Sequence, residues 1–141
     1  MKVRLMPAGP EDAPAMAAIL GNWVAATDWM PDLHTPAQTK AFCAGLTPQT
    51  VIARGITGVL GFLARREAEI LCLYVEPPGH GVGSALLAQA QAVRPRLALW
   101  TFAANTGARR FYARHGFAEI GGTAGDNDEG LPDIRLEWRR P

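Results

Sequence analysis

Two short stretches of the sequence hold the residues best suited to chemistry, and the first centres on a glycine-rich turn. Residues 71–87 run from an apolar segment through glycines at positions 79, 81 and 83 into a helical pattern. Because glycine has no Cβ atom, a ligand can closely approach the N–H groups of this turn, and the start of the helix adds a partial positive charge. The turn is therefore predicted to bind an anion such as a diphosphate, unless it is only a tight strand-to-helix connection.

The second stretch is a short helix over residues 105–115 that carries a phenol. Asn105 lies near the start of this helix, and Tyr112 lies on the same side as Ala108. A phenol has an ordinary pKa of ~10, so Tyr112 keeps its proton at neutral pH and can donate it as a general acid. The alternative is that Phe111 and Tyr112 are core aromatics of an amphipathic helix.

The elements that must position these residues follow from the periodicity of the sequence. A helix opened by residues 9–12 has one apolar face, made of Ala13, Met16, Ala17, Leu20 and Val24. A second helix begins at Thr35–Pro36, with Gln38 in a capping box, and has an apolar face of Phe42, Cys43 and Leu46. Strands are predicted at the N-terminus and over residues 50–54, 59–65, 69–75, 97–102, 117–121 and 133–138, and further helices over 82–93 and 105–115, the last capped by Gly116. This order predicts an α/β fold in which helices flank a mixed, largely antiparallel sheet, with residues 1–141 forming a single domain.

Length, charge and cysteine content exclude several classes of protein. The chain has 141 residues, 48% of them hydrophobic, and a formal net charge of +1. These values predict one sizeable core, and neither a nucleic acid nor an anionic membrane as the main partner. Cys43 and Cys72 match neither a disulfide framework nor a metal-ligand spacing, so we expect reduced thiols and no metal. No apolar stretch is long enough to span a membrane and the N-terminus lacks the apolar region of a signal peptide, which predicts a soluble, cytoplasmic protein.

The order and spacing of the two stretches resemble the core of the GNAT N-acetyltransferases, which transfer an acetyl group from acetyl-CoA to an amine. The family's glycine turn follows a strand that ends Val-x-Pro, here Val75-Glu76-Pro77, and its glycines match Gly81 and Gly83. The second family motif matches Asn105, Ala108, Phe111, Tyr112, Gly116 and Phe117. Pro78 stands where the family usually has Gln or Arg, and the turn is shorter than usual. Because proline has neither a side-chain donor nor an N–H, this departure lowers the expected cofactor affinity.

The resemblance implies which residues bind acetyl-CoA, the cosubstrate. Main-chain groups of Leu73, Tyr74 and Val75 would meet the thioester carbonyl and the pantetheine amides. The diphosphate would lie against Gly79, His80, Gly81, Val82, Gly83 and Ser84, and the pantetheine arm against Asn105, Ala108 and Phe111. Tyr112 would protonate the departing thiolate. Arg109 and Arg110 are expected on the solvated face of their helix, unless one of them meets the 3′-phosphate of CoA.

Acetyl transfer also requires that the acceptor ammonium lose a proton. Some family members carry a catalytic glutamate at the position of Glu69, the first residue of its strand, so Glu69 is the candidate base; the alternatives are a solvent-facing Glu69 and ordered water as the base. Residues 29–34 and 126–129 would border the acceptor, with Asp32 or Asp126 as counter-ion to a small cationic amine. The alternative is that both segments are ordinary solvated loops.

The expected function is direct acetyl transfer from acetyl-CoA to a primary amine of an unidentified small molecule or peptide, without a covalent acetyl-enzyme. An alternative, which Pro78 favours, is a non-catalytic acyl-CoA-binding or regulatory module with the same fold. A third is an interaction protein that forms a homodimer through a sheet edge or through its exposed tryptophans.

Overall fold

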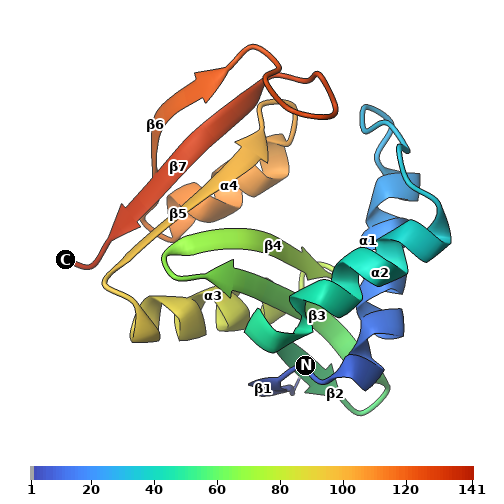
Figure 1. Cartoon of the computed structure of the whole chain (residues 1–141). Helices are drawn as coiled ribbons and strands as arrows, with labels where there is room; N and C mark the ends of the chain where they lie inside the picture. Colours follow the sequence, from blue (N-terminus) through green and yellow to red (C-terminus); the bar gives the residue numbers. More distant parts are fainter. Residues whose placement is uncertain (1) are drawn as a thin grey trace.

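A seven-stranded sheet runs through the centre of the molecule, which a computed structural model describes over residues 2–141. The strands lie in the order β1-β2-β3-β4-β5-β7-β6 (Figure 1). They span Arg4–Pro7 (β1), Thr50–Gly55 (β2), Gly58–Arg66 (β3), Glu69–Val75 (β4), Arg96–Phe102 (β5), Ala118–Thr123 (β6) and Asp133–Arg139 (β7). All neighbouring strands in this order are antiparallel except β4 and β5, which are parallel. The predicted mixed, largely antiparallel sheet is confirmed.

Helices cover both faces of the sheet. They span Ala13–Ala26 (α1), Pro36–Leu46 (α2), Val82–Val93 (α3) and Thr106–Arg114 (α4), and short 3-10 turns occupy Pro10–Asp12 and Thr47–Gln49. Met16 of α1 packs with Phe62 of β3 in one buried cluster, to which α2 also contributes. Leu86 of α3 packs with Leu97 of β5 in a second cluster, to which α4 contributes. The apolar stripe of each helix is thus buried against one side of the same sheet.

Strands β4 and β5 separate soon after they meet. Within residues 2–141 their register contains one pair, Glu69 with Ala98, and the Ala98 N–H also donates to the Ala68 carbonyl at 2.9 Å. Beyond this pair the two strands diverge as a V (Figure 1). The edge of β4 that faces β5 therefore carries main-chain N–H and C=O groups that the sheet does not use and that need other partners.

Helix α2 shows how far local sequence sets an element. Thr35 accepts from the Gln38 N–H at 3.1 Å, and the Gln38 side chain accepts from the Thr35 N–H at 2.8 Å, so the predicted capping box is confirmed. Cys43 and Leu46 are buried as predicted, but Phe42 is 52% exposed. The prediction for Phe42 is wrong because this residue lies about 100° around the helix from Cys43, outside the stripe that faces the sheet.

Two predicted boundaries shift by one or two residues, as element ends often do. Helix α4 ends at Arg114 with His115 as its cap residue. Gly116, the predicted cap, comes next with a φ of 88°, a left-handed conformation that favours glycine. Strand β6 continues to Thr123, two residues beyond the end predicted at residue 121.

Both cysteines are free and buried. Burial, with a smaller contribution from Cys43, raises the pKa of the Cys72 thiol to about 12. Cys72 therefore stays protonated and is a poor nucleophile. Over residues 2–141, no helix is long and apolar enough to cross a membrane, and no three or more His, Cys, Asp or Glu side chains cluster as metal ligands would.

Candidate active site

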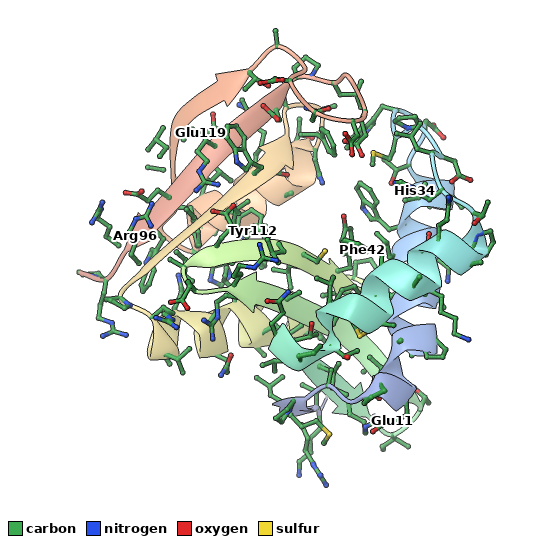
Figure 2. All side chains as sticks on the ribbon, viewed as in Figure 1. Glu11, His34, Phe42, Arg96, Tyr112 and Glu119 are labelled. Carbon is green, nitrogen blue, oxygen red and sulfur yellow. The ribbon has the colours of Figure 1, made fainter. Side chains whose placement is uncertain are left out.

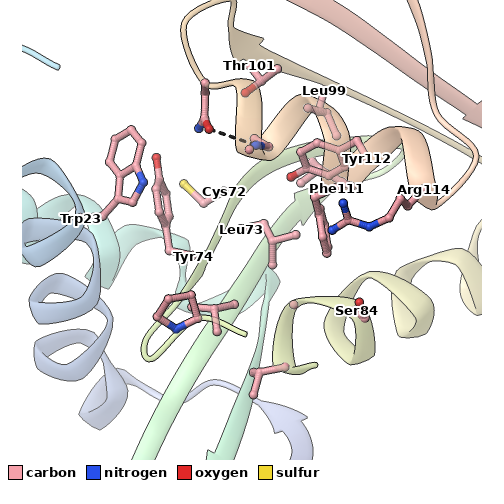
Figure 3. A pocket seen from close by; sticks show the side chains of 18 of the residues that line it. Trp23, Cys72, Leu73, Tyr74, Ser84, Leu99, Thr101, Phe111, Tyr112 and Arg114 are labelled. Carbon is pink, nitrogen blue, oxygen red and sulfur yellow. Dashed lines mark hydrogen bonds between the residues drawn. The ribbon is translucent and has the colours of Figure 1, made fainter. Parts of the chain in front are cut away.

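A cleft of about 640 Å³ lies where β4 and β5 separate (Figure 3). Its walls come from β4, the end of β5, the start of α3 and one side of α4. Most residues predicted for the cofactor site line it: Leu73, Tyr74, Val75, Gly79, Gly81, Val82, Gly83, Ser84, Asn105, Ala108, Phe111 and Tyr112. The fold thus brings together the two stretches that the second half of α3 and the whole of β5 separate in the sequence.

The turn between β4 and α3 presents unpaired N–H groups to this cleft. Gly79 and Gly81 have φ values of 83° and 75°, which L side chains rarely adopt. The Gly81 carbonyl accepts the first helical hydrogen bond, from the Ala85 N–H at 3.0 Å, and no side chain of the described residues caps the helix. The N–H groups of residues 82–84 therefore lack a partner within the helix. Together with the helix dipole they suit an anion.

The free edge of β4 offers further N–H groups, at alternate residues. The Glu76 N–H donates to the Leu60 carbonyl of β3 at 2.8 Å, within an antiparallel pairing. Because hydrogen-bond direction alternates along a strand, the main chain of Tyr74 also faces β3, whereas that of Leu73 and Val75 faces the cleft. This direction speaks against the predicted main-chain role of Tyr74, although the residue lines the cleft.

Asn105 both begins α4 and lines the cleft. Its Oδ1 accepts from the Ala108 N–H at 3.0 Å and so caps the helix. The side-chain Nδ2 remains as a donor. A Cβ placed on Gly83 would lie 3.5 Å from the ring of Phe111, so α4 is packed closely against the start of α3. This packing fixes Asn105 relative to the glycine turn.

Tyr112 brings a phenol hydroxyl to the middle of the molecule (Figure 2). The side chain is 7% exposed and packs edge-to-face against Phe111 and Phe117. The hydroxyl has no hydrogen-bond partner within residues 2–141, and it points into the cleft (Figure 3). Burial, with a smaller contribution from Cys72, raises the pKa of Tyr112 above its ordinary value, because an apolar site disfavours the phenolate. Tyr112 is therefore a protonated donor aimed into the cleft.

Ser84 and His115 connect the start of α3 to the end of α4. Their side chains lie 3.0 Å apart, Oγ to Nε2, and the His115 ring packs on Phe111 with centroids 4.8 Å apart. Burial, followed by the charge of Arg114, lowers the pKa of His115, which favours a neutral imidazole at pH 7. The pair joins the two helices that border the cleft.

Glu69 and His80 were both predicted for the site, and the structure brings neither into it. Glu69 lies where β4 and β5 still pair, at the closed end of the V. Its two carboxylate oxygens accept from the two terminal nitrogens of Arg135, both at 2.7 Å. His80 is exposed, and neither residue lines the cleft. The first position of β4 precedes the divergence of the strands, so it does not reach the space that they enclose.

Arg114 is a cleft residue that the sequence analysis did not assign. It lines the cleft from α4, and Figure 3 shows its guanidinium turned back toward Phe111. Arg109, by contrast, is paired with Glu119 at 2.9 Å, and Arg110 does not line the cleft. Arg114 follows Phe111 by three residues, a spacing that puts two side chains on one face of a helix. This spacing from Phe111 could have predicted Arg114 as a cleft residue.

Comparison with known proteins agrees with this geometry. Residues 47–119 match the family described as "Acetyltransferase (GNAT) domain". The fold is similar to that of apo-form YjaB from Escherichia coli, with 21% identity, a TM-score of 0.82 and 100% of both chains covered. It is also similar to a GNAT-family acetyltransferase from Bacillus cereus (16% identity, TM-score 0.79, 100% of this chain and 99% of that one). The structure of yncA from Salmonella typhimurium with its cofactor acetyl-CoA is 15% identical, with a TM-score of 0.74, over 100% of this chain and 95% of that one.

No curated protein matches the sequence. The family match, however, covers more than half of the chain and includes both the glycine turn and the whole Asn105–Phe117 motif. The predicted resemblance is confirmed, and the chain belongs to the GNAT acetyltransferase family.

Proposed function

We propose that the protein is an acetyl-CoA-dependent N-acetyltransferase that moves the acetyl group directly to a primary amine of a small molecule or peptide. The observation that carries the proposal is one cleft with three kinds of group: the free N–H groups of residues 82–84, the free edge of β4 and the Tyr112 hydroxyl. Acyl transfer from a phosphorylated thioester needs these same parts, an anion site, an oxyanion donor and an acid.

The cofactor end of the cleft fits acetyl-CoA. The N–H groups of residues 82–84 suit its diphosphate, and Arg114 supplies a positive charge that Pro78 in the turn cannot. The Asn105 Nδ2 and the main chain of Val75 suit the amides of the pantetheine arm. When bound, acetyl-CoA supplies the acetyl group as a thioester.

The transfer balances one bond formed against one bond broken. The acceptor ammonium loses a proton to solvent, and its nitrogen then forms a C–N bond to the acetyl carbonyl carbon as the C–S bond breaks. The sulfur keeps the electron pair of that bond and takes the proton of the Tyr112 hydroxyl. The nitrogen releases a second proton, which returns Tyr112 to its neutral form and leaves an amide and a thiol. Leu73, whose N–H lies at the free edge of β4, would donate to the carbonyl oxygen as charge develops there.

Calorimetric titration with acetyl-CoA, beside a titration with CoA, tests the cofactor end. We expect micromolar binding of both ligands, because the main-chain donors do not depend on the side chain at position 78. A thiol-release assay with a panel of primary amines tests the transfer. Failure to bind either ligand at millimolar concentration would contradict the proposal.

A non-catalytic acyl-CoA-binding module is the second candidate, and Pro78 is the observation that favours it. Pro78 lines the cleft at the turn, where it offers neither an N–H nor a polar side chain. Tight binding of acetyl-CoA without thiol release from any amine would support this candidate. The cleft-facing Tyr112 hydroxyl argues for catalysis, because a binding module does not need a proton donor beside the thioester.

A further inference from the structure

Four aromatic side chains from separate segments meet at the open end of the V. They are Trp23 of α1, Trp29 of the α1–α2 connection, Tyr74 of β4 and Phe102 of β5, here called the aromatic wall. Ring centroids lie 5.8 Å apart for Trp23–Trp29, 5.3 Å for Trp23–Tyr74 and 5.7 Å for Trp29–Phe102. None of the four is fully buried, and Figure 3 shows Trp23 beside Tyr74 at the edge of the cleft. Accessible aromatic faces in a concave site are typical of ligand contacts.

A second cavity, of about 410 Å³, continues from the cleft. It shares Trp100, Thr101 and Phe102 of β5 with the cleft, and its far side is the β6–β7 loop with Asp126 and Glu129. Figure 1 shows this loop and the α1–α2 connection on the side toward which the V opens. The acceptor end of the cleft therefore has aromatic rings on one side and carboxylates on the other.

The two loops that border this end carry negative charge only, and Arg135, which lies over the Trp100 ring at 5.3 Å, is paired with Glu69. Residues 27–35 and 124–132 contain five acidic residues and no lysine or arginine: Asp28, Asp32, Asp126, Asp128 and Glu129. None of the five forms an ion pair within residues 2–141. Of the described residues that line the two cavities, Arg114 at the cofactor end is the only lysine or arginine. Such a distribution attracts cations and disfavours an acceptor that carries a carboxylate.

Hydrogen bonds hold the β6–β7 loop in this position. The Asp133 Oδ1 accepts from the Thr123 N–H at 2.9 Å and from its hydroxyl at 2.7 Å, and Oδ2 accepts from the Asn127 Nδ2 at 3.0 Å. Asn127 in turn accepts from the Leu131 N–H at 3.2 Å. The Asp133 carboxylate is thus engaged within the loop. The carboxylates of Asp126 and Glu129, which make no side-chain hydrogen bond within residues 2–141, are left for a ligand.

Glu129 lies within electrostatic reach of the aromatic wall. Burial is the main cause of the raised pKa of Tyr74, and the negative charge of Glu129 also raises it. Tyr74 is therefore close enough to Glu129 to sense its charge, and it lines the same cleft as Tyr112. The cleft that holds Tyr112 and the cavity that holds Glu129 share Phe102, so one ligand with two polar ends can extend from one to the other.

We infer that the acceptor is a small amine with a second positive charge, an alkyl diamine or polyamine. Its reacting nitrogen would lie beside Tyr112, and its second ammonium between the aromatic wall and the carboxylates of Asp126 and Glu129. A cation over aromatic faces and beside carboxylates is bound by both. The inference rests on the proposed function, and the second ammonium takes no part in the acetyl transfer described above.

Three acceptors of one chain length test the inference: butane-1,4-diamine, butylamine and 4-aminobutanoate. Their far ends carry a positive charge, no charge and a negative charge. With acetyl-CoA saturating, we expect kcat/KM for the diamine to exceed that for butylamine by about tenfold or more, and 4-aminobutanoate to be the poorest, since one charge-assisted contact changes affinity by about this factor. Equal values for the diamine and butylamine, or a preference for 4-aminobutanoate, would overturn the inference.

Matched variants of the β6–β7 loop locate the effect. Glu129→Gln should lower kcat/KM for the diamine about tenfold and for butylamine less than about twofold, because only the diamine places a charge there. Asp128→Asn is the control, since Asp128 is exposed and lines neither cavity. Equal losses for both amines in Glu129→Gln would overturn the assignment of Glu129. Acetylation of butylamine without a diamine preference would leave the proposed function standing, whereas acetyl-CoA binding without acetylation of any amine would overturn both.

Discussion

The two ends of the cleft are built from different parts of the chain. At the cofactor end the donors are mostly main-chain groups, the N–H groups of residues 82–84 and the free edge of β4. At the acceptor end the contacts are side chains, the aromatic wall and the carboxylates of the β6–β7 loop. A main-chain site depends on local conformation and is expected to tolerate changes of side chain. A side-chain site changes its ligand whenever one loop residue changes. The first end suits an invariant cosubstrate, and the second suits a variable acceptor.

The largest expected effect is the difference between two variants, Tyr112→Phe and Tyr74→Phe, whose tyrosines both line the cleft. Tyr112→Phe should lower kcat about 100-fold, the scale of a general acid, while the Kd for acetyl-CoA stays within about twofold. Tyr74→Phe is the matched control, because its ring also lines the cleft but stands on the acceptor side. It should raise the KM for the amine and leave kcat within about threefold. A fully active Tyr112→Phe enzyme would remove Tyr112 from the acid role.

The pH dependence of the reaction sharpens the same assignment. Burial raises the pKa of Tyr112, so the phenol holds its proton above the pH at which a free tyrosine would lose it. With subsaturating amine, kcat/KM should rise about tenfold per pH unit from pH 7 to 9, as the neutral amine becomes more abundant. The profile should show no falling limb in that range. A fall in rate below pH 9 would mean that an acid other than Tyr112 is being deprotonated.

The next effect tests whether the cofactor end uses a side chain at all. Arg114→Ala should weaken acetyl-CoA binding about tenfold, because a charged contact with a phosphate is lost. Arg110→Ala on the same helix is the control and should change the Kd less than about twofold, since Arg110 does not line the cleft. Calorimetric titrations of the two variants with acetyl-CoA and with 3′-dephospho-CoA would show which phosphate is contacted. Equal Kd values for Arg114→Ala and the unaltered protein would mean that Arg114 does not contribute and that main-chain groups alone bind the phosphates.

A smaller effect is expected from loosening the loop at the acceptor end. Burial opposes ionisation of Asp133, but hydrogen bonds from Thr123 and Asn127 outweigh it and lower the pKa of the carboxyl. Asp133 therefore stays ionised, and holds the loop, at every pH above about 4. In Asp133→Asn, an amide NH₂ group would face the donors of Thr123 and Asn127, so part of these hydrogen bonds would be lost. The KM for the amine should rise about threefold, and the Kd for acetyl-CoA should not change. A changed Kd for acetyl-CoA would show that the two ends of the cleft are coupled.

The cofactor end was largely predictable from the sequence, whereas of the acceptor end the sequence indicated only two bordering loops, residues 29–34 and 126–129. Glycine spacing, a helix start and the alternation of a strand are local properties, so the turn at Gly79–Ser84 and the boundaries of α3 follow from short segments. The aromatic wall depends on residues such as Trp23 and Phe102, which are far apart in sequence. Only the divergence of β4 from β5 brings them together. The sequence carries no signal of where two paired strands separate, so it did not show that Glu69 lies before that point.

The smallest expected effect concerns Glu69, which the sequence predicts as the candidate base. Glu69 and Arg135 form a two-point ion pair at the closed end of the V, with side chains 34% and 21% exposed. Glu69→Gln should leave kcat within about twofold, because the side chain does not reach the cleft, and should lower the free energy of unfolding by ~1 kcal/mol or less, as expected for a partly exposed pair. Glu67→Gln, in the adjacent turn, is the matched control for removing a negative charge. If Glu69→Gln alone slowed turnover by about two orders of magnitude, as loss of a general base does, Glu69 would be restored as the base. That result would also mean that β4 and β5 close further around the substrate than the free protein shows.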